Sequence, residues 1–202
     1  MNAPKVKFHL AGLKQILMPR PKDADLSKPS GPAQALFGPP PERPADGKSR
    51  DLVDFLKKVD IFKDFQQGDL KRLARIVHER NYRDGEVIYE QGQPGAALYL
   101  VRDGVVEIVV RKRNGEEVPL MLLEPSASLE EWAATGAEMV RLTSARARGP
   151  ASLVAIGHSD MEALIRNFPT LASKILMKVA QVMAMRIHTF LEAEYFNEES
   201  EQ

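Results

Sequence analysis

The feature that most constrains the fold of this chain is a change in apolar periodicity near Gly85. Apolar and polar residues alternate over 85–92, 96–104 and 105–124, and glycine-containing turns separate these runs. Alternation with a period of two is typical of half-buried β-strands. Two more strands are predicted at about 141–148 and 152–156. This many short strands in succession predicts a small β-barrel or sandwich.

Helical periodicity flanks the strands on both sides. Residues 49–62 and 66–82 are predicted as two helical segments, the second with an apolar side that includes Leu70 and Leu73. After the strands, Ser159 and Glu162 have the spacing of a capping box. A long helix is predicted from about Pro169 to Glu194, since proline suits the first helical position. Its apolar residues form a broad stripe: Leu171, Ile175, Leu176, Val179, Val182, Met183, Ile187, Phe190 and Leu191.

The first 48 residues are predicted to be an arm outside the globular part. Nine of the 14 prolines lie in residues 1–50, and proline removes a backbone donor and fixes φ. Within the arm, residues 5–18 form a short amphipathic motif. It could fold back on its own domain, dock into a groove of a partner protein, or bind a membrane surface. The apolar positions that would bind a partner are Val6, Leu10, Leu13, Ile16 and Leu17.

The division of the chain follows from these patterns. We predict a proline-rich arm at 1–48, a globular domain at 49–168, and a long helix with an acidic tail at 169–202. Charge is uneven, because residues 1–50 carry nine Lys or Arg and four Asp or Glu although the whole chain has a formal net charge of +0. The chain has no cysteine, no signal-peptide pattern and no apolar run long enough to span a membrane. We therefore expect a cytoplasmic protein.

The sequence contains few features that indicate an enzyme. The four histidines lack metal-ligand spacing, so no metal site is predicted. There is no nucleophile elbow, P-loop or dinucleotide-binding glycine pattern. Glu130 and Glu131 are adjacent, but paired carboxylates catalyse only with a substrate between them. We expect a non-catalytic protein without a cofactor.

Residues 59–168 resemble the cyclic-nucleotide-binding domain family, which includes bacterial catabolite-activator-type regulators, kinase regulatory subunits and gated channels. The most specific stretch is VDIFKDFQQGDLKRLARIVHERNYRDGEVIYEQGQPGAALYLVRDGVVEIVV, and the later RLTSARARGPASLVAIGHSDMEALIRNFP also matches. Gly85, Gly92, Gly95 and Gly104 fall where that family turns between strands. The resemblance implies an α+β fold, a cyclic-nucleotide-binding-like β-roll (a double-stranded β-helix or jelly-roll barrel) flanked by N-terminal helices and a long C-terminal helix.

The resemblance also locates a ligand site. The family motif is similar to Phe-Gly-Glu-x-Ala-Leu, followed by an arginine and a strand of small residues. Its glycine lets backbone N–H groups approach the ligand phosphate, its arginine pairs with the phosphate, and its glutamate binds the ribose hydroxyl. Carried onto this chain, the motif implies a set of candidate ligand-binding residues. They are Glu131, Trp132, Ala133, Arg141, Leu142 and Thr143.

The chain departs from the motif at Glu130, which occupies the glycine position. A carboxylate there obstructs the backbone approach and repels a phosphate by a few kcal/mol at about 4 Å and a surface-like dielectric. The carboxylates of Glu130 and Glu131 could instead cap the short helix and pair with Arg141. Three alternatives follow: a degenerate pocket that binds no standard cyclic mononucleotide, a functional sensor of cAMP or cGMP, or a pocket for another ligand such as a cyclic dinucleotide.

The expected output of this domain is protein–protein contact. The chain is expected to lack a helix-turn-helix after the long helix, so we predict no DNA binding. We predict a regulatory or scaffolding subunit with partner contacts through the arm and the long helix. The long helix is also the predicted homodimer element. Its contact residues are predicted to be Val179, Met183, Ile187 and Phe190.

Overall fold

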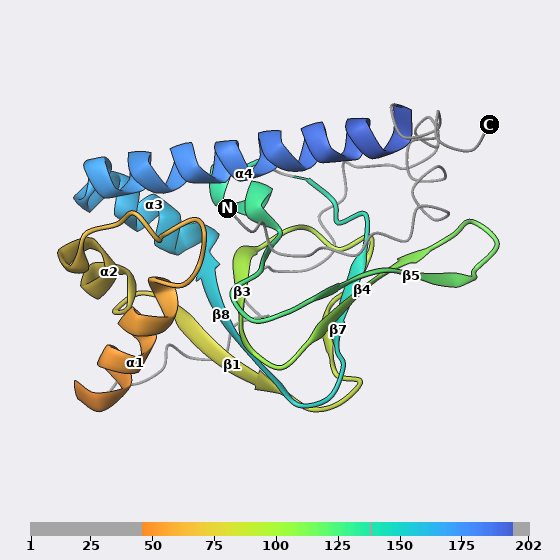
Figure 1. The fold of residues 1–202 in the computed structure, drawn as a ribbon, viewed down its shortest axis with the longest axis horizontal. Coiled ribbons are helices and arrows are strands. Elements are labelled where there is room, and N and C mark those ends of the chain that lie inside the picture. The colour runs from red at the N-terminus through yellow and green to blue at the C-terminus, as the bar shows by residue number, and fades with distance from the viewer. Residues whose placement is uncertain (1–45, 138, 196–202) are drawn as a thin grey trace.

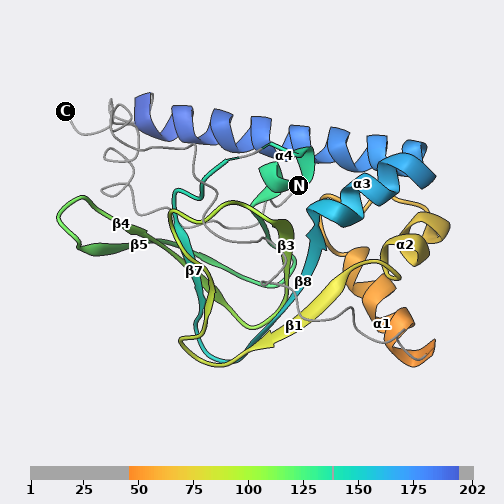
Figure 2. The same cartoon turned by 180° about the vertical axis from the view of Figure 1, so that it is seen from behind.

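Two four-stranded antiparallel sheets form the centre of the computed structural model, which describes residues 46–137 and 139–195. The first sheet has the order β1-β8-β3-β6 and the second the order β2-β7-β4-β5 (Figures 1 and 2). The first comprises β1 (His78–Tyr82), β8 (Ala151–Gly157), β3 (Ala97–Asp103) and β6 (Ser128–Leu129); the second comprises β2 (Val87–Tyr89), β7 (Ser144–Ala147), β4 (Val106–Arg111) and β5 (Glu117–Leu123). The predicted α+β β-roll is confirmed.

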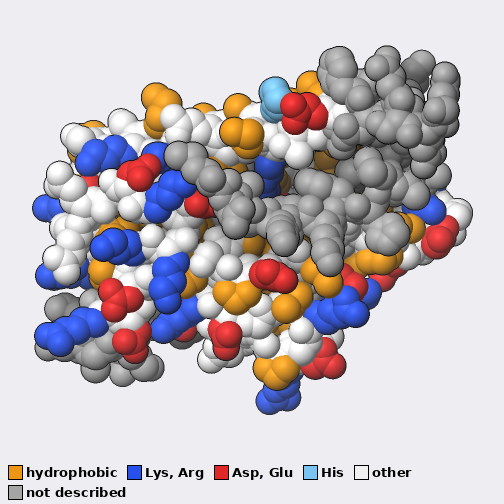
Figure 3. Space-filling view, in the orientation of Figure 1, with side chains coloured by type: hydrophobic (Ala, Val, Ile, Leu, Met, Phe, Trp, Pro, Cys, Tyr) orange, Lys and Arg blue, Asp and Glu red, His pale blue; other side chains and the backbone are white. Residues whose placement is uncertain are grey.

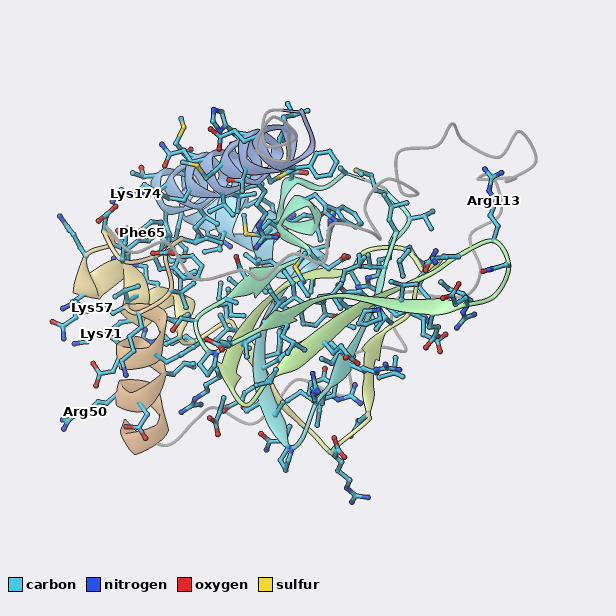
Figure 4. All side chains as sticks on the ribbon, turned by 45° about the vertical axis from the view of Figure 1, so that its right-hand side comes forward. Arg50, Lys57, Phe65, Lys71, Arg113 and Lys174 are labelled. Atoms are coloured by element: carbon cyan, nitrogen blue, oxygen red, sulfur yellow. The ribbon has the colours of Figure 1, made fainter. Side chains whose placement is uncertain are left out.

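Helices cover one face of the first sheet. They are α1 (Asp46–Leu56), α2 (Gln67–Leu73), α3 (His158–Asn167) and α4 (Pro169–Tyr195). Helices α1 to α3 gather at one end of the molecule, and α4 runs along the β-roll (Figure 1). Figure 4 shows Arg50 of α1, Lys57 just after α1, and Lys71 of α2 projecting outward, so these cations lie on the solvent side of the helical end. The long C-terminal helix and the two short N-terminal helices are present as predicted, but α1 ends at Leu56 and does not extend to residue 62.

Alternation along the central strands explains the two cores. In β3, Leu98 and Leu100 face a helical core, whereas Tyr99 and Val101 face the interior of the β-roll. Because side chains alternate between the faces of a strand, one strand serves both cores. Strand β8 pairs with β3 and shows the same alternation, with Val154 facing the helices. The sheet is therefore buried on both sides, and the inner core surrounds the candidate site.

Two local predictions were wrong. The second predicted helix ends early, because α2 stops at Leu73 and His78–Tyr82 forms strand β1, where Leu153 and its neighbours in β8 supply hydrogen-bond partners. The predicted capping box is displaced by two residues. Helix α3 has Gly157 as its N-cap, and the Asp160 carboxylate accepts the Gly157 N–H at 2.8 Å.

The β4–β5 hairpin contains Asn114-Gly115, a dipeptide that is typical of a type I′ turn. A type I′ turn needs positive φ at both central residues. Gly115 has φ 85°, but Asn114 is not in the positive region. The Gly115 N–H donates to the Lys112 carbonyl, as in a longer loop closed by a left-handed glycine. Figure 4 shows Arg113 near the tip of this hairpin.

The arm at 1–48 and the acidic tail lie largely outside the described residues, as do the motif at 5–18 and the partner positions Val6, Leu10, Leu13, Ile16 and Leu17. Their roles stay predictions. Within the described ranges, no helix combines the length and apolar character that crossing a bilayer requires.

Candidate functional site

A pair of loops positions Arg141 in the β-roll. The Arg141 N–H donates to the carbonyl of Gln93, and the Gly92 N–H donates to the carbonyl of Arg141, both at 2.9 Å. Next to these bonds, Pro94 and Val140 form an isolated antiparallel bridge. The segment before β7 is thereby fixed against the β2–β3 loop, and the Arg141 side chain enters the interior.

Arg141 forms a buried ion pair with Glu130. Its Nε donates to Glu130 Oε2 at 2.9 Å, and the two side chains are 1% and 7% exposed. The guanidinium carbon lies 4.5 Å from the ring centroid of Tyr89, which adds a cation–π contact. One guanidinium nitrogen, Nη2, is buried without a hydrogen-bond partner. The charge of this arginine is thus balanced mainly by a carboxylate of its own chain.

Glu130 keeps the backbone conformation that suits a glycine. Its φ of 60° and ψ of 36° lie in the left-handed region, which is uncommon for a residue with a side chain. Burial raises the pKa of the Glu130 carboxyl above its usual value, and the charge of Arg141 opposes that rise. The position that the resemblance assigns to the motif's glycine therefore has a backbone conformation that favours glycine, but it carries a carboxylate directed at Arg141.

Glu131 is held by helix α4. Arg186 donates from Nη1 to Glu131 Oε2 at 2.8 Å, and its Nη2 lies 2.7 Å from Glu131 Oε1. Arg186 Nη2 also donates to the Ser128 carbonyl at 2.7 Å, and the Ser128 hydroxyl donates to Glu131. Glu131 begins the short 3₁₀ helix η3 (Glu131–Thr135), so this network joins η3 to α4. The carboxylate that the resemblance assigns to a ribose contact is bound within the chain.

Trp132 explains why position 95 is glycine. Gly95 does not have positive φ, but a Cβ placed on it would lie 2.0 Å from the Trp132 ring. The indole therefore packs directly on the backbone of the β2–β3 loop. Trp132 is a packing residue that fastens η3 to this loop, and Gly95 lies between β2 and β3 as predicted.

We expect Gly95→Ala to lower the free energy of unfolding by about 1–3 kcal/mol, the usual cost of overpacking. Trp132 is the only tryptophan, so displacement of its ring should also change the intrinsic fluorescence. Gly68→Ala is the matched control, because its added Cβ meets only Arg72 at 3.6 Å. Chemical denaturation followed by fluorescence tests both variants. Equal stability of the two would contradict the packing role.

The other predicted ligand residues lie in different environments. Ala133 is buried, and Thr143 is half-buried beside Tyr89. Leu142 is 63% exposed, so its side chain points away from the interior. The structure brings Glu131 and Arg141 into one buried region but leaves Leu142 outside it.

The space left in the β-roll is small. A cavity of about 50 Å³ adjoins Arg141, whereas sites for small-molecule ligands usually enclose roughly 300–1,000 Å³. Its lining comes from β1, β2, β3, β8 and Arg141: His78, Arg80, Tyr82, Ile88, Tyr99, Arg141, Leu153 and Ala155. The cavity is therefore well below the volume that such ligands usually occupy.

Sequence reasoning missed the residues that complete the network: Ser128, Tyr89, Tyr99 and Arg186. The role of Arg186 could have been suspected from the sequence. It is the single arginine of α4 and falls at helical spacing from Val179, Val182 and Phe190. Although its side chain is 47% exposed, its guanidinium reaches a carboxylate that is 4% exposed. That carboxylate belongs to Glu131.

The predicted dimer residues of α4 are divided between two environments. Val179 is fully buried in the helical core, so its assignment to a partner surface is corrected. Met183 and Phe190 are half-buried, and Ile187 is 59% exposed. Among residues 46–137 and 139–195, no three His, Asp or Glu side chains gather in a way that could hold a metal.

Comparison with known proteins agrees with this architecture. A family model described as "Cyclic nucleotide-binding domain" matches residues 79–168. These residues belong to the cyclic nucleotide-binding domain family. The cyclic AMP receptor protein of Thermus thermophilus is 35% identical over 126 residues, which cover 62% of this chain and 58% of the receptor protein.

Other relatives share only the domain. The potassium channel GORK of Arabidopsis thaliana is 36% identical over 76 residues, 38% of this chain and 9% of the channel. The chain thus spans less than a tenth of the first curated relatives that it matches. A cyclic nucleotide-binding domain from Methylobacillus flagellatus has a TM-score of 0.64 at 20% identity, covering 75% of this chain and 85% of that one. At that identity the likeness concerns the fold.

Proposed function

We propose that this chain is a non-catalytic cyclic-nucleotide-binding-like domain with impaired binding of cAMP and cGMP, and that it acts as a regulatory or scaffolding subunit through protein contacts. The observation that carries this proposal is the buried Glu130–Arg141 pair. The arginine that would pair with a ligand phosphate already has a carboxylate partner. A phosphate entering there would displace Glu130 or lie beside its negative charge.

Two further observations support the loss of binding. Glu131 is engaged by Arg186 and Ser128, so a ribose hydroxyl would have to compete with a charged hydrogen-bond network. The remaining cavity of about 50 Å³ is also too small for a nucleotide. A nucleotide would therefore find its phosphate partner and its ribose partner already engaged, and the cavity too small, in this conformation.

Calorimetric titration of the purified chain with cAMP, cGMP and a cyclic dinucleotide, together with thermal melts, tests this part of the proposal. We expect no saturable heat and no shift of the melting temperature at millimolar ligand. Saturable binding that is lost in Arg141→Ala would refute it. A nucleotide-binding relative, measured in parallel, confirms that each ligand preparation is active.

A second candidate function is a sensor that passes ligand binding to a partner through α4. The unpartnered Nη2 of Arg141 favours it, because Arg141 lines the cavity and this buried nitrogen can donate a hydrogen bond to an anion. In this alternative a ligand displaces Glu130 and releases Glu131 from Arg186, and α4 then moves. The same titrations distinguish the alternatives, because only the sensor binds with measurable affinity.

The protein-contact part of the proposal concerns the arm, whose apolar motif and excess of cations make it a candidate tether. Deletion of residues 1–48 is expected to abolish co-purification of partners while leaving the melting temperature unchanged. Unchanged co-purification would contradict the tether. A loss of stability would show instead that the motif packs on its own domain.

A further inference from the structure

The cavity beside Arg141 differs from the position that the resemblance assigns to a nucleotide. Of the six residues that the resemblance assigns to a ligand, only Arg141 lines the cavity, and no residue of η3 does. The other walls come from β1, β2, β3 and β8. Strands β1 and β2 are edge strands of the two sheets, and Arg80 on β1 is exposed. The cavity therefore adjoins an edge of the β-roll where a small solute can enter.

The polar groups in the wall of this cavity can all donate hydrogen bonds. They are two guanidinium groups, one imidazole and two phenols, and no carboxylate lines the cavity: Arg80, Arg141, His78, Tyr82 and Tyr99. Burial raises the pKa of Tyr82 to about 12 and also raises the pKa of Tyr99, so both phenols keep their protons at neutral pH. Such a wall favours an anion over a cation.

One of these donors is buried without an acceptor. Nη2 of Arg141 has no hydrogen-bond partner among the described residues, although the arginine side chain is almost completely buried. The Nε of the same guanidinium donates to Glu130, which leaves Nη2 as the group still to be satisfied. A buried charged donor without an acceptor costs free energy. An acceptor in the adjoining cavity would therefore stabilise the folded chain.

We infer that this cavity binds a small monovalent inorganic anion of the size of chloride, which accepts a hydrogen bond from Arg141. The volume of about 50 Å³ suits one such ion, since a water molecule takes up roughly 30 Å³ in the liquid. A second negative charge on the ion would be opposed by Glu130, which already balances Arg141. The inference goes beyond the proposed function, because the ion displaces neither Glu130 nor Glu131 and requires no nucleotide.

Thermal melts in sodium chloride and in sodium gluconate at equal ionic strength test the site. Gluconate is too large for the cavity, so only chloride should give a saturable rise of the melting temperature, as expected for a ligand of the folded state. General attraction of anions is a poor alternative, because Figure 3 shows Lys and Arg interspersed with Asp and Glu over the described part of that face. Equal melting temperatures in the two salts would overturn the inference.

A pair of arginine variants tests where the ion binds. Arg80→Gln should weaken the apparent chloride affinity by about tenfold, because one charge-assisted hydrogen bond is lost from the wall. Arg102→Gln is the matched control, since Arg102 also pairs with a carboxylate, that of Glu79 on β1, but does not line the cavity. It should leave the chloride affinity unchanged. Equal losses in both variants would point to general electrostatics and contradict the assigned site.

Bromide, which replaces chloride and scatters anomalously, locates the ion directly. Crystals of the full chain soaked in sodium bromide should give an anomalous peak within hydrogen-bonding distance of Nη2 of Arg141. The peak should be absent from crystals of Arg80→Gln soaked at the same low bromide concentration. A water molecule at that position in the unchanged chain, without an anomalous peak, would overturn the inference.

Discussion

Arg141→Ala should lower the free energy of unfolding by about 3–5 kcal/mol, the usual cost of removing one partner of a buried ion pair. The reason is that Glu130, only 7% exposed, would keep a carboxylate without its counter-ion. The packing of the guanidinium on Tyr89 would be lost as well. Thermal and denaturant unfolding measure the change.

The size of this loss should depend on pH. Burial already raises the pKa of Glu130, and removal of Arg141 takes away the main influence that lowers it. Because the folded-state pKa lies above the unfolded value, the carboxyl favours folding when protonated, and that contribution disappears as the pH rises through the folded pKa. Arg141→Ala should therefore be less destabilised near pH 5 than near pH 8.

Two control variants separate the ion pair from other effects. Glu130→Gln combined with Arg141→Ala should recover part of the lost stability, since no ionised group then stays buried. Arg146→Ala removes an arginine that is 40% exposed and pairs with Glu107, and surface pairs contribute about 1 kcal/mol or less. A loss in Arg141→Ala no greater than in Arg146→Ala would contradict a structural role for the buried pair.

The sequence was informative where a single physical pattern decides the structure. Alternation with a period of two predicted the strands, because one residue in two must face a core. The apolar stripe predicted α4 nearly to its ends, since a long helix can bury such a stripe only on its own domain or a partner. The boundary of α2 was misjudged because residues 78–82 are mostly polar, and the backbone pairing with β8 that makes them a strand is a tertiary contact.

The candidate site was predictable only in part. Arg141 and Glu131 could be located from the motif, and a carboxylate at Glu130 indicated a partner for the arginine. The contact between Glu131 and Arg186 joins residues 55 positions apart, and nothing local specifies it. The same limit applies to α4, where sequence alone could not separate the face that packs on the helical core from the face that is exposed.

Glu130→Gly is expected to raise the affinity for cAMP or cGMP by about 100-fold or more. Removing the carboxylate eliminates a repulsion of a few kcal/mol at about 4 Å, and each 1.4 kcal/mol corresponds to a factor of ten in affinity. Glycine also adopts the φ of 60° at this position without strain. The variant should be less stable without ligand, because Arg141 then lacks its partner, and ligand should restore that stability.

Comparison with Glu130→Gln shows which property of glycine matters. Glutamine removes the charge but keeps a side chain beside the phosphate position, so it should recover only part of the affinity that glycine recovers. Titration calorimetry of both variants beside the unchanged chain measures the difference. If neither binds, Glu130 is not the main obstacle, and the pairing of Glu131 with Arg186 keeps the small cavity closed. Arg186→Gln added to Glu130→Gly would then be expected to open it, because α4 loses its hold on η3 and the ribose position becomes free.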